Sequence, residues 1–364
     1  MLSLTELNLS ENPFKNITPI PGQKTDQELP WADMSQVKNN LEEVYNRASS
    51  LNSRQVILNW GPYGGGKTFA AYHFIDKEYQ NEQLTQIYIR SPKDGNNAPS
   101  EFFKGIIDFL SFSGIQKQVK KIVEESSEEE VFKLIDSNIR SEEFAESILL
   151  FNSDDEDDVE TLRRYIYSGL TKTELKKAGL HRNIDSTTDK IKFLAGIFTC
   201  YIANRDGNII LWIDEMEDLV YFTKKQYTLF SRMIRDLIDT MNYNFTLFFN
   251  FTLAEPDEST IELLLGDAIN RRIDKRIRLK EFSEEDALTY CKDLIDFYKI
   301  EDKNNLYPFT EEALKLVFKS IRSADLTPSE INKSCSRLLE FSLQKNKNLI
   351  DEETTRDWIN KYYE

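Results

Sequence analysis

The chain has 364 residues, of which 40% are hydrophobic and 30% charged, and its formal net charge is −16. This length predicts two or three domains with enough apolar side chains for a core in each. No apolar run reaches the ~18 residues of a membrane span, and the start of the sequence has no signal-peptide pattern. Three separated cysteines and two histidines form no metal-site spacing, which favours a reduced, cytoplasmic protein.

The negative charge is concentrated between residues 124 and 160, where fifteen acidic residues are accompanied only by Lys133 and Arg140. The rest of the chain is therefore close to neutral. A surface that binds nucleic acid broadly would need the opposite sign over a whole face. The composition therefore disfavours such a surface and leaves open a local basic patch.

The first 35 residues contain several prolines and no periodic pattern, which predicts an extended segment over 1–35. A helix should follow, with Ser35 as its cap. Strands are then predicted over the mainly apolar runs 55–60, 86–90, 208–213 and 245–252, and a further strand is predicted over 276–280. In the segments between these strands, the apolar residues recur at helical spacing. Buried strands that alternate with helices predict an α/β fold with a parallel sheet covered on both faces.

Two regions depart from that alternation. Residues from about 100 to 200 have mostly helical spacing and include the acidic run, which predicts a helical insertion. From Ser283 onward the pattern is entirely helical and begins with a cap and an acidic first turn. The sequence therefore predicts an N-terminal segment at 1–35, an α/β core at 36–282 and an all-helical domain at 283–364.

A glycine-rich loop follows the first predicted strand and matches the pattern GxxxxGK[ST]. In that pattern backbone N–H groups wrap phosphates, and glycine is needed where the backbone approaches the ligand closely. The candidate phosphate-binding residues are Gly61, Gly64, Gly65, Gly66, Lys67 and Thr68. Lys67 would supply a cation to the β- and γ-phosphates, and Thr68 a hydroxyl to magnesium. A flexible turn is the alternative, and the flanking strand and helix disfavour it.

Asp214 and Glu215 directly follow the predicted strand 208–213. Ligands of open α/β sheets bind at this carboxyl edge. Asp214 would hold magnesium through its water shell, and Glu215 would orient the attacking water. A polar strand exit is the alternative, and the presence of the glycine loop disfavours it. The two motifs together predict an enzyme that binds ATP with Mg²⁺ and hydrolyses it to ADP and phosphate.

The glycine loop and the run Asp214-Glu-Met-Glu-Asp-Leu219 resemble the AAA+ ATPases, in particular the origin-recognition initiators. The resemblance implies a five-stranded parallel P-loop sheet and makes the helical end a lid. It further implies that Asn250, at the end of the next strand, senses the γ-phosphate, with Thr252 as the alternative. An arginine before the fifth strand would reach a neighbouring subunit's nucleotide; Arg271 is favoured over Arg272, and a solvated basic helix end is the other reading.

The same resemblance places Trp31 against the adenine, for which an ordinary buried aromatic is the alternative. Many members of the family carry an arginine beside the proline that corresponds to Pro328, but this sequence has Ser329 there. Arg322 or Lys333 could substitute for it. Because of this departure, a module that binds ATP and hydrolyses little of it remains an alternative.

The two phosphate motifs lie further apart than in a plain AAA+ core, and the insertion accounts for the difference. Residues 162–180 are similar to ATP-binding proteins of bacterial phage-exclusion and other conflict loci, over a region of about 160–290. Residues 170–180 also resemble a helix-turn-helix whose recognition helix would be 185–193. The mixed charge of that helix favours a structural helical insert over DNA reading.

Taken together, the motifs predict an ATP-driven switch that forms a homo-oligomer or assembles with an effector or client protein. Antiviral genome defence or mobile-element biology is the favoured setting. The alternative from another class is a DNA-engaging initiator or loader, which the lack of a winged-helix pattern after the lid disfavours. Nucleic acid is therefore the less favoured partner, and no contact with a membrane is expected.

Overall fold

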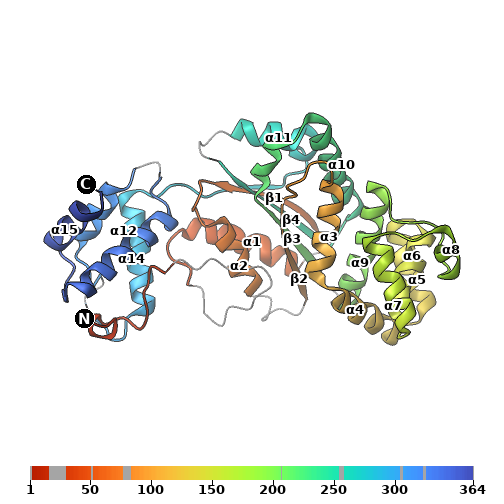
Figure 1. The fold of residues 1–364 in the computed structure, drawn as a ribbon, viewed down its shortest axis with the longest axis horizontal. Helices are drawn as coiled ribbons and strands as arrows, with labels where there is room; N and C mark the ends of the chain where they lie inside the picture. The colour runs from red at the N-terminus through yellow and green to blue at the C-terminus, as the bar shows by residue number, and fades with distance from the viewer. Residues whose placement is uncertain are drawn as a thin grey trace.

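The computed structural model of the chain describes residues 2–15, 30–50, 52–76, 83–205, 207–253, 258–303, 306–322 and 325–363. Three parts follow one another along the long axis of the molecule (Figure 1): the helical lid with the N-terminus, the sheet in the middle, and the outer helices of the insertion. In the described part of the chain, no helix is long and apolar enough to cross a membrane.

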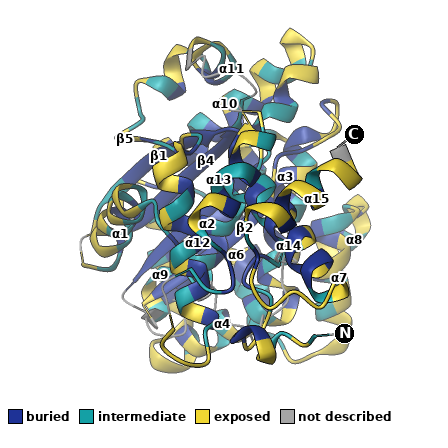
Figure 2. Ribbon diagram, turned by 90° about the vertical axis from the view of Figure 1, so that its left-hand side faces the viewer, coloured by how far each residue is buried: buried dark blue, intermediate teal, exposed yellow. Residues whose placement is uncertain are grey.

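Five strands form one sheet in the order β2-β3-β4-β1-β5, and every pairing is parallel. The strands are β1 (Arg54–Gly61), β2 (Leu84–Arg90), β3 (Asn208–Asp214), β4 (Phe245–Thr252) and β5 (Lys275–Arg278). Their carboxyl ends therefore meet at one edge of the sheet. Strands β1 to β4 are buried along nearly their whole length (Figure 2), as expected for a parallel sheet with both faces covered, whereas only Ile277 of the edge strand β5 is buried. The predicted α/β fold is confirmed.

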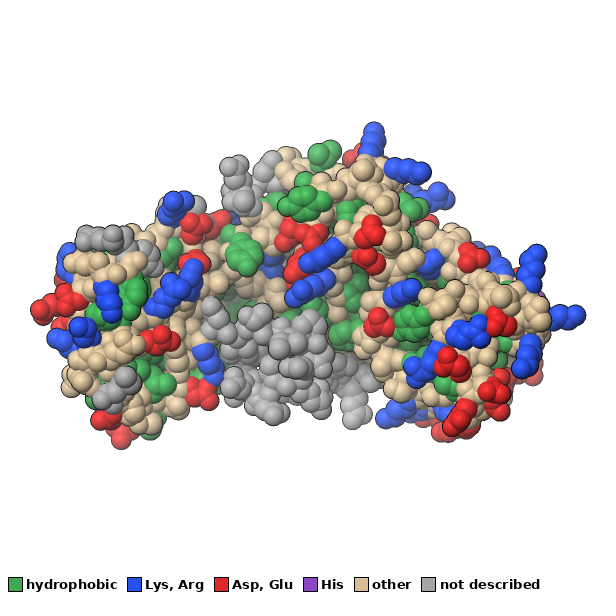
Figure 3. Space-filling view, in the orientation of Figure 1, with side chains coloured by type: hydrophobic (Ala, Val, Ile, Leu, Met, Phe, Trp, Pro, Cys, Tyr) green, Lys and Arg blue, Asp and Glu red, His purple; other side chains and the backbone are tan. Residues whose placement is uncertain are grey.

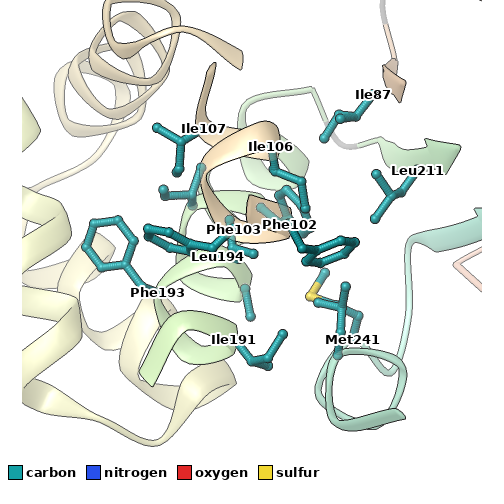
Figure 4. Packing of buried hydrophobic residues seen from close by; sticks show 14 of the residues in the cluster. Ile87, Phe102, Phe103, Ile106, Ile107, Ile191, Phe193, Leu194, Leu211 and Met241 are labelled. Atoms are coloured by element: carbon teal, nitrogen blue, oxygen red, sulfur yellow. The ribbon is translucent and has the colours of Figure 1, made fainter. Parts of the chain in front are cut away.

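Helices cover both faces of this sheet. On one face, α1 (Ser35–Ser50) and α2 (Lys67–Asp76) pack on alternate strand residues that include Ile57, Trp212 and Phe248. The intervening residues face α3 (Ala98–Leu110), α9 (Thr187–Arg205) and α10 (Lys224–Thr240), with α11 (Glu258–Asn270) outside α10. Figure 4 shows the α3 side chains Phe102 and Ile106 turned toward β2 and β3, and Phe103 and Ile107 turned toward α9.

The insertion lies between β2 and β3. Its outer helices are α4 (Phe112–Glu125), α5 (Glu128–Ile139), α6 (Glu142–Leu149), α7 (Glu156–Tyr167) and α8 (Lys172–Lys177). They form one apolar core with α9. The expected recognition helix 185–193 is the start of α9, where Ile191, Phe193 and Leu194 are buried. These side chains join the segment to the core of the insertion, while Asp185, Ser186 and Thr188 are exposed.

Part of the acidic run has a structural cause. Asp155 caps α7 by accepting hydrogen bonds from two backbone N–H groups of the first turn, and three further acids stand in that turn. In the same way, Ser127 and Glu130 form a capping box at α5. Carboxylates at a helix N-terminus offset the positive end of the helix dipole. Much of the negative charge of the insertion therefore stabilises helix starts.

The lid consists of α12 (Glu284–Tyr298), α13 (Glu311–Ser320), α14 (Pro328–Gln344) and α15 (Glu352–Tyr363). Ser283 caps α12 in a capping box with Asp286, as the sequence predicts. The N-terminal residues Leu7, Leu9 and Phe14 are buried in the core of the lid. They contribute a short 3-10 helix, η1 (Thr5–Leu7). Residues 2–15 therefore belong with the lid rather than with a separate extended segment; residues 16–29 lie outside the described residues.

Candidate functional site

The glycine loop connects β1 to α2 at the carboxyl edge of the sheet. Gly64 and Gly66 have φ angles of +73° and +96°, a backbone region that side chains disfavour. A Cβ at Gly61 would lie 2.4 Å from the carbonyl oxygen of Leu279, just beyond β5. Glycine is therefore required at 64 and 66 by the backbone conformation of the loop, and at 61 by its close contact with Leu279. It leads directly into the N-terminus of α2, where free N–H groups favour anions.

Lys67 is 5% exposed, and its Nζ donates to the carbonyl oxygens of Gly61 and Pro62 at 3.1 and 2.7 Å. Burial lowers the pKa of Lys67 to about 8, while the charges of Glu217 and Asp214 act in the opposite direction. A buried ammonium group is costly unless it is paired. Here it is held by loop carbonyls, in a position from which it could reach a phosphate bound by the loop.

Asp214 is the last residue of β3 and is 3% exposed. Its Oδ2 accepts hydrogen bonds from the hydroxyls of Thr68 at 2.7 Å and Tyr88 at 2.6 Å. Its Oδ1 accepts from the backbone N–H of Glu215 at 2.9 Å. The structure thus brings Thr68 and Asp214 together, as the sequence predicts. Tyr88 was not among the predicted residues; its one signal is a hydroxyl group on a buried strand.

Glu215 has a left-handed backbone conformation with φ 57° and ψ 37°. Such a conformation in a residue other than glycine is strained and is frequent at functional sites. The side chain is 35% exposed and forms ion pairs with Arg90 at 3.6 Å and Lys93 at 3.8 Å. Both cations come from the end of β2 and the loop after it. They were not predicted, because only the pairing of β2 with β3 places them there.

Asn250 on β4 is completely buried and pairs in register with Asn59 on β1. The Nδ2 of Asn59 donates to the Oδ1 of Asn250 at 3.1 Å. The Nδ2 of Asn250 and the Oδ1 of Asn59 have no hydrogen-bond partner among the described residues. An unpaired buried amide is unfavourable and calls for a ligand or ordered water. Thr252, the alternative to Asn250, is half-buried, and its N–H donates to Glu217 at 2.9 Å.

Trp31 is half-buried beside α2, and its ring centroid lies 5.7 Å from that of Phe69 and 5.2 Å from that of His73. Its indole N–H donates to the carbonyl oxygen of Asp33. The N–H of Asp33 in turn donates to Asp293 on the lid helix α12 at 2.9 Å. The short segment around Trp31 therefore contacts both the helix after the glycine loop and the lid.

The lid touches the glycine loop through the N-terminus of α14. The N–H of Ser329 donates to the carbonyl oxygen of Gly64 at 3.3 Å, and a Cβ at Gly64 would lie 2.6 Å from the Cβ of Ser329. Ser329 therefore occupies the position at which the family resemblance leads one to expect an arginine. Of the proposed substitutes, Lys333 pairs with Glu330 on its own helix at 3.2 Å, and Arg322 is exposed.

Arg271 and Arg272 differ in their surroundings. Arg272 donates two hydrogen bonds, of 2.8 and 2.7 Å, to Asp239 on α10. Arg271 is exposed at the end of α11, and within the described residues its side chain has no hydrogen bond or ion pair. The bound guanidinium of Arg272 is a structural contact, whereas that of Arg271 is available. The structure does not connect Arg271 with the other candidate residues of its own chain.

The donor set suits magnesium held together with a nucleotide. Mg²⁺ prefers oxygen ligands, keeps several waters, and is usually bound through one or two carboxylates and substrate phosphates. Thr68 and Asp214 provide such oxygens next to the loop. In the part of the chain that the structure describes, no group of three or more His, Cys, Asp or Glu residues could hold a metal by itself. The oxygens of Thr68 and Asp214 therefore fit Mg²⁺ held together with a nucleotide.

A parallel sheet in the order β2-β3-β4-β1-β5, a glycine loop after β1, an acidic pair after β3 and a helical lid define the AAA+ P-loop fold. No protein-family model matches the sequence, and no curated protein matches it. Among solved structures, the chain is similar to Drosophila ORC bound to DNA, with 12% identity and a TM-score of 0.52 over 99% of this chain. The ADP form of the Aeropyrum pernix ORC2 protein is similar at 11% identity, a TM-score of 0.50 and 97% of this chain.

The match covers 66% of the Drosophila chain, just under two thirds of its length, and 73% of the Aeropyrum chain. At these identities the likeness establishes the fold.

Proposed function

We propose that the chain binds ATP with Mg²⁺ at the glycine loop and hydrolyses it to ADP and phosphate. The observation that carries this proposal is the hydrogen bond between Thr68 and Asp214 at the mouth of the loop, next to the buried Lys67. These residues come from two segments far apart in the sequence. Their convergence at the carboxyl edge of a parallel sheet supports a phosphate site with a metal.

Each candidate residue has a role in this proposal. The loop from Gly61 to Gly66 holds the phosphates with its N–H groups, and Lys67 contacts the β- and γ-phosphates. Thr68 and Asp214 hold the magnesium, which neutralises the charge that develops on the phosphates. Trp31 lies against the adenine.

Two further residues act at the γ-phosphate in this proposal. Glu215 positions the water that attacks it. The Nδ2 of Asn250, which has no partner among the described residues, can donate to the γ-phosphate or to that water.

The first prediction tests this chemistry. Glu215→Gln should leave ATP affinity unchanged and lower turnover by at least about a hundredfold, because the substitution removes the carboxylate that positions water. Binding is measured by calorimetry with a slowly hydrolysed ATP analogue, and turnover by phosphate release. Glu285→Gln, on the exposed first turn of α12, is the matched control and should hydrolyse ATP at the wild-type rate.

Turnover of Glu215→Gln within about threefold of wild type would remove Glu215 from the mechanism. A wild-type chain that binds ATP and does not hydrolyse it, with or without partners, would instead support the binding module with little turnover. The serine at position 329 favours that outcome, since no lid arginine contacts the loop in the described structure.

We further propose that the chain acts as a switch that assembles with itself or with an effector protein in genome defence or mobile-element biology. The sequence resemblance over about 160–290 supports the setting, and the available Arg271 supports the assembly. Expression of the chain with its neighbouring genes in a bacterial host, followed by phage challenge, tests the setting. Protection that Lys67→Ala abolishes would support it.

A DNA-engaging initiator is the second candidate, and the similarity in fold to Drosophila ORC bound to DNA favours it. On the face shown in Figure 3, however, Lys and Arg side chains are interspersed with Asp and Glu over the insertion. Titration with duplex DNA at several salt concentrations separates the two candidates. A micromolar or tighter dissociation constant at physiological salt, with a steep salt dependence, would favour the initiator.

A further inference from the structure

Tyr88 occupies an unusual position on β2. It is 3% exposed, its ring packs against Tyr72 with a centroid distance of 5.0 Å, and it belongs to the same apolar cluster as Trp212 and Phe248. A phenylalanine would fill the same volume. A buried hydroxyl is unfavourable without a partner. The hydroxyl of Tyr88 has one, since it donates to Oδ2 of Asp214 at 2.6 Å.

The hydrogen bonds of Asp214 determine which part of its carboxylate stays free. A carboxylate offers about four acceptor positions, two on each oxygen. Tyr88 and Thr68 take the two on Oδ2, and the N–H of Glu215 takes one on Oδ1. One acceptor position on Oδ1 therefore remains. Without Tyr88 the carboxylate would be held less firmly, and a second position, on Oδ2, would become free.

We propose that Tyr88 is a positioning residue for magnesium: it fixes the carboxylate of Asp214 so that the free acceptor position on Oδ1 faces the water shell of the ion. This inference rests on the proposed Mg²⁺–ATP site. Burial, together with the charge of Asp214, raises the pKa of Tyr88 well above its usual range.

The structure supplies a matched control. The hydroxyl of Tyr72, on the neighbouring helix α2, is also buried but has no hydrogen-bond partner among the described residues. Tyr88→Phe and Tyr72→Phe each delete one buried hydroxyl from the same aromatic pair. Only the first deletes a bond to Asp214. A difference between the two variants therefore reports on that bond and not on packing.

The experiment measures how binding of a fluorescent, slowly hydrolysed ATP analogue depends on the Mg²⁺ concentration. Tyr88→Phe should raise the Mg²⁺ concentration for half-maximal binding about tenfold, as expected for loss of a hydrogen bond to a charged group. Its affinity for the analogue in EDTA should stay unchanged. Tyr72→Phe should match wild type in both measurements. In an Asp214→Asn background, Tyr88→Phe should have no further effect.

Tyr88→Met is a second variant that lacks the hydroxyl and fills the space with a flexible apolar side chain. If either variant at position 88 folds and keeps its Mg²⁺ requirement within about twofold of wild type, the proposal is wrong. An equal shift in Tyr72→Phe would also overturn it, because packing would then be the cause. A wild-type chain that binds no analogue with or without Mg²⁺ would refute the proposed function itself, which distinguishes the two failures.

Discussion

At the scale of single residues, the protonation of Lys67 gives the proposed site a pH dependence. Burial holds the pKa of Lys67 near 8 in the free protein, and anionic phosphates beside it would raise that pKa. ATP affinity should therefore be constant below pH 8 and fall above it, approaching tenfold per pH unit. At pH 8, binding should take up about half a proton, which calorimetry in buffers of different ionisation enthalpy measures.

Lys67→Arg is the control for this prediction, because an arginine stays charged throughout the range. Its affinity can be lower, since the guanidinium has a different shape, but it should not change between pH 7 and pH 9. Wild-type binding without proton uptake at pH 8 would show that Lys67 is fully charged before the nucleotide arrives.

The residues that the sequence predicts best are those whose neighbours are close in sequence or fixed by a strand end. Thr68 follows Lys67 in one motif, and Asp214 ends the most apolar strand, so their meeting at the sheet edge could be predicted. Tyr88 and Asn59 could not be predicted in this way. Their contacts depend on β2 lying beside β3 and on β1 lying beside β4, in one particular register. The residue pattern of a single sequence does not show which strands are neighbours or in which register they pair.

At the scale of elements, all five predicted strands are present. The buried strands β1 to β4 have mainly apolar sequences, whereas the run 276–280, which includes most of the edge strand β5, alternates charged and apolar residues. The predicted helical insertion is also present, and the capping boxes at Ser127 and Ser283 show the local signals that mark helix starts. The association of the N-terminal residues with the lid was not foreseen. Leu7 and Phe14 lie in irregular sequence, where no period indicates which core will bury them.

Phe14 provides a test of that association. Its ring is fully buried and meets Phe309 edge-on at 5.6 Å. Phe14→Ala should lower the stability of the lid by about 3–5 kcal/mol through lost burial and the resulting cavity. Hydrogen exchange resolved along the chain is the suitable measurement, because a protein with several units need not unfold in one step. Amides of α13 and α14 should exchange faster, while those of β3 and β4 should not.

Phe297→Ala is the matched control, because this phenylalanine also belongs to the lid but is 43% exposed. Its effect should stay below about 1 kcal/mol. If the lid amides are equally protected from hydrogen exchange in Phe14→Ala and in wild type, the burial of Phe14 does not stabilise the lid.

At the scale of the whole molecule, the proposed assembly makes a prediction about mixed subunits. If Arg271 completes a neighbour's site, Arg271→Ala should bind ATP normally and hydrolyse it at least about a thousandfold more slowly, as for arginines of related phosphoryl-transfer sites. Mixing it with Glu215→Gln should restore part of the activity, since some interfaces would combine an intact glutamate with an intact arginine. Phosphate release from the mixture measures the rescue.

The specific rate of the wild-type chain should also rise with protein concentration. Arg356→Ala, on the lid helix α15, is the control arginine and should behave like wild type. A rate independent of concentration, with no rescue on mixing, would contradict the assembly and would leave the ATP site itself intact.

The burial of the N-terminal residues in the lid has a consequence for synthesis on the ribosome. Leu7, Leu9 and Phe14 are translated long before the helices that bury them, which begin only after Ser283, roughly 270 residues later. At ~5–20 residues per second, these side chains stay exposed to solvent for on the order of tens of seconds. The sheet can be completed within that time. A chaperone that binds apolar segments would therefore find a target in residues 7–14 of the nascent chain, and its release would coincide with the emergence of the lid.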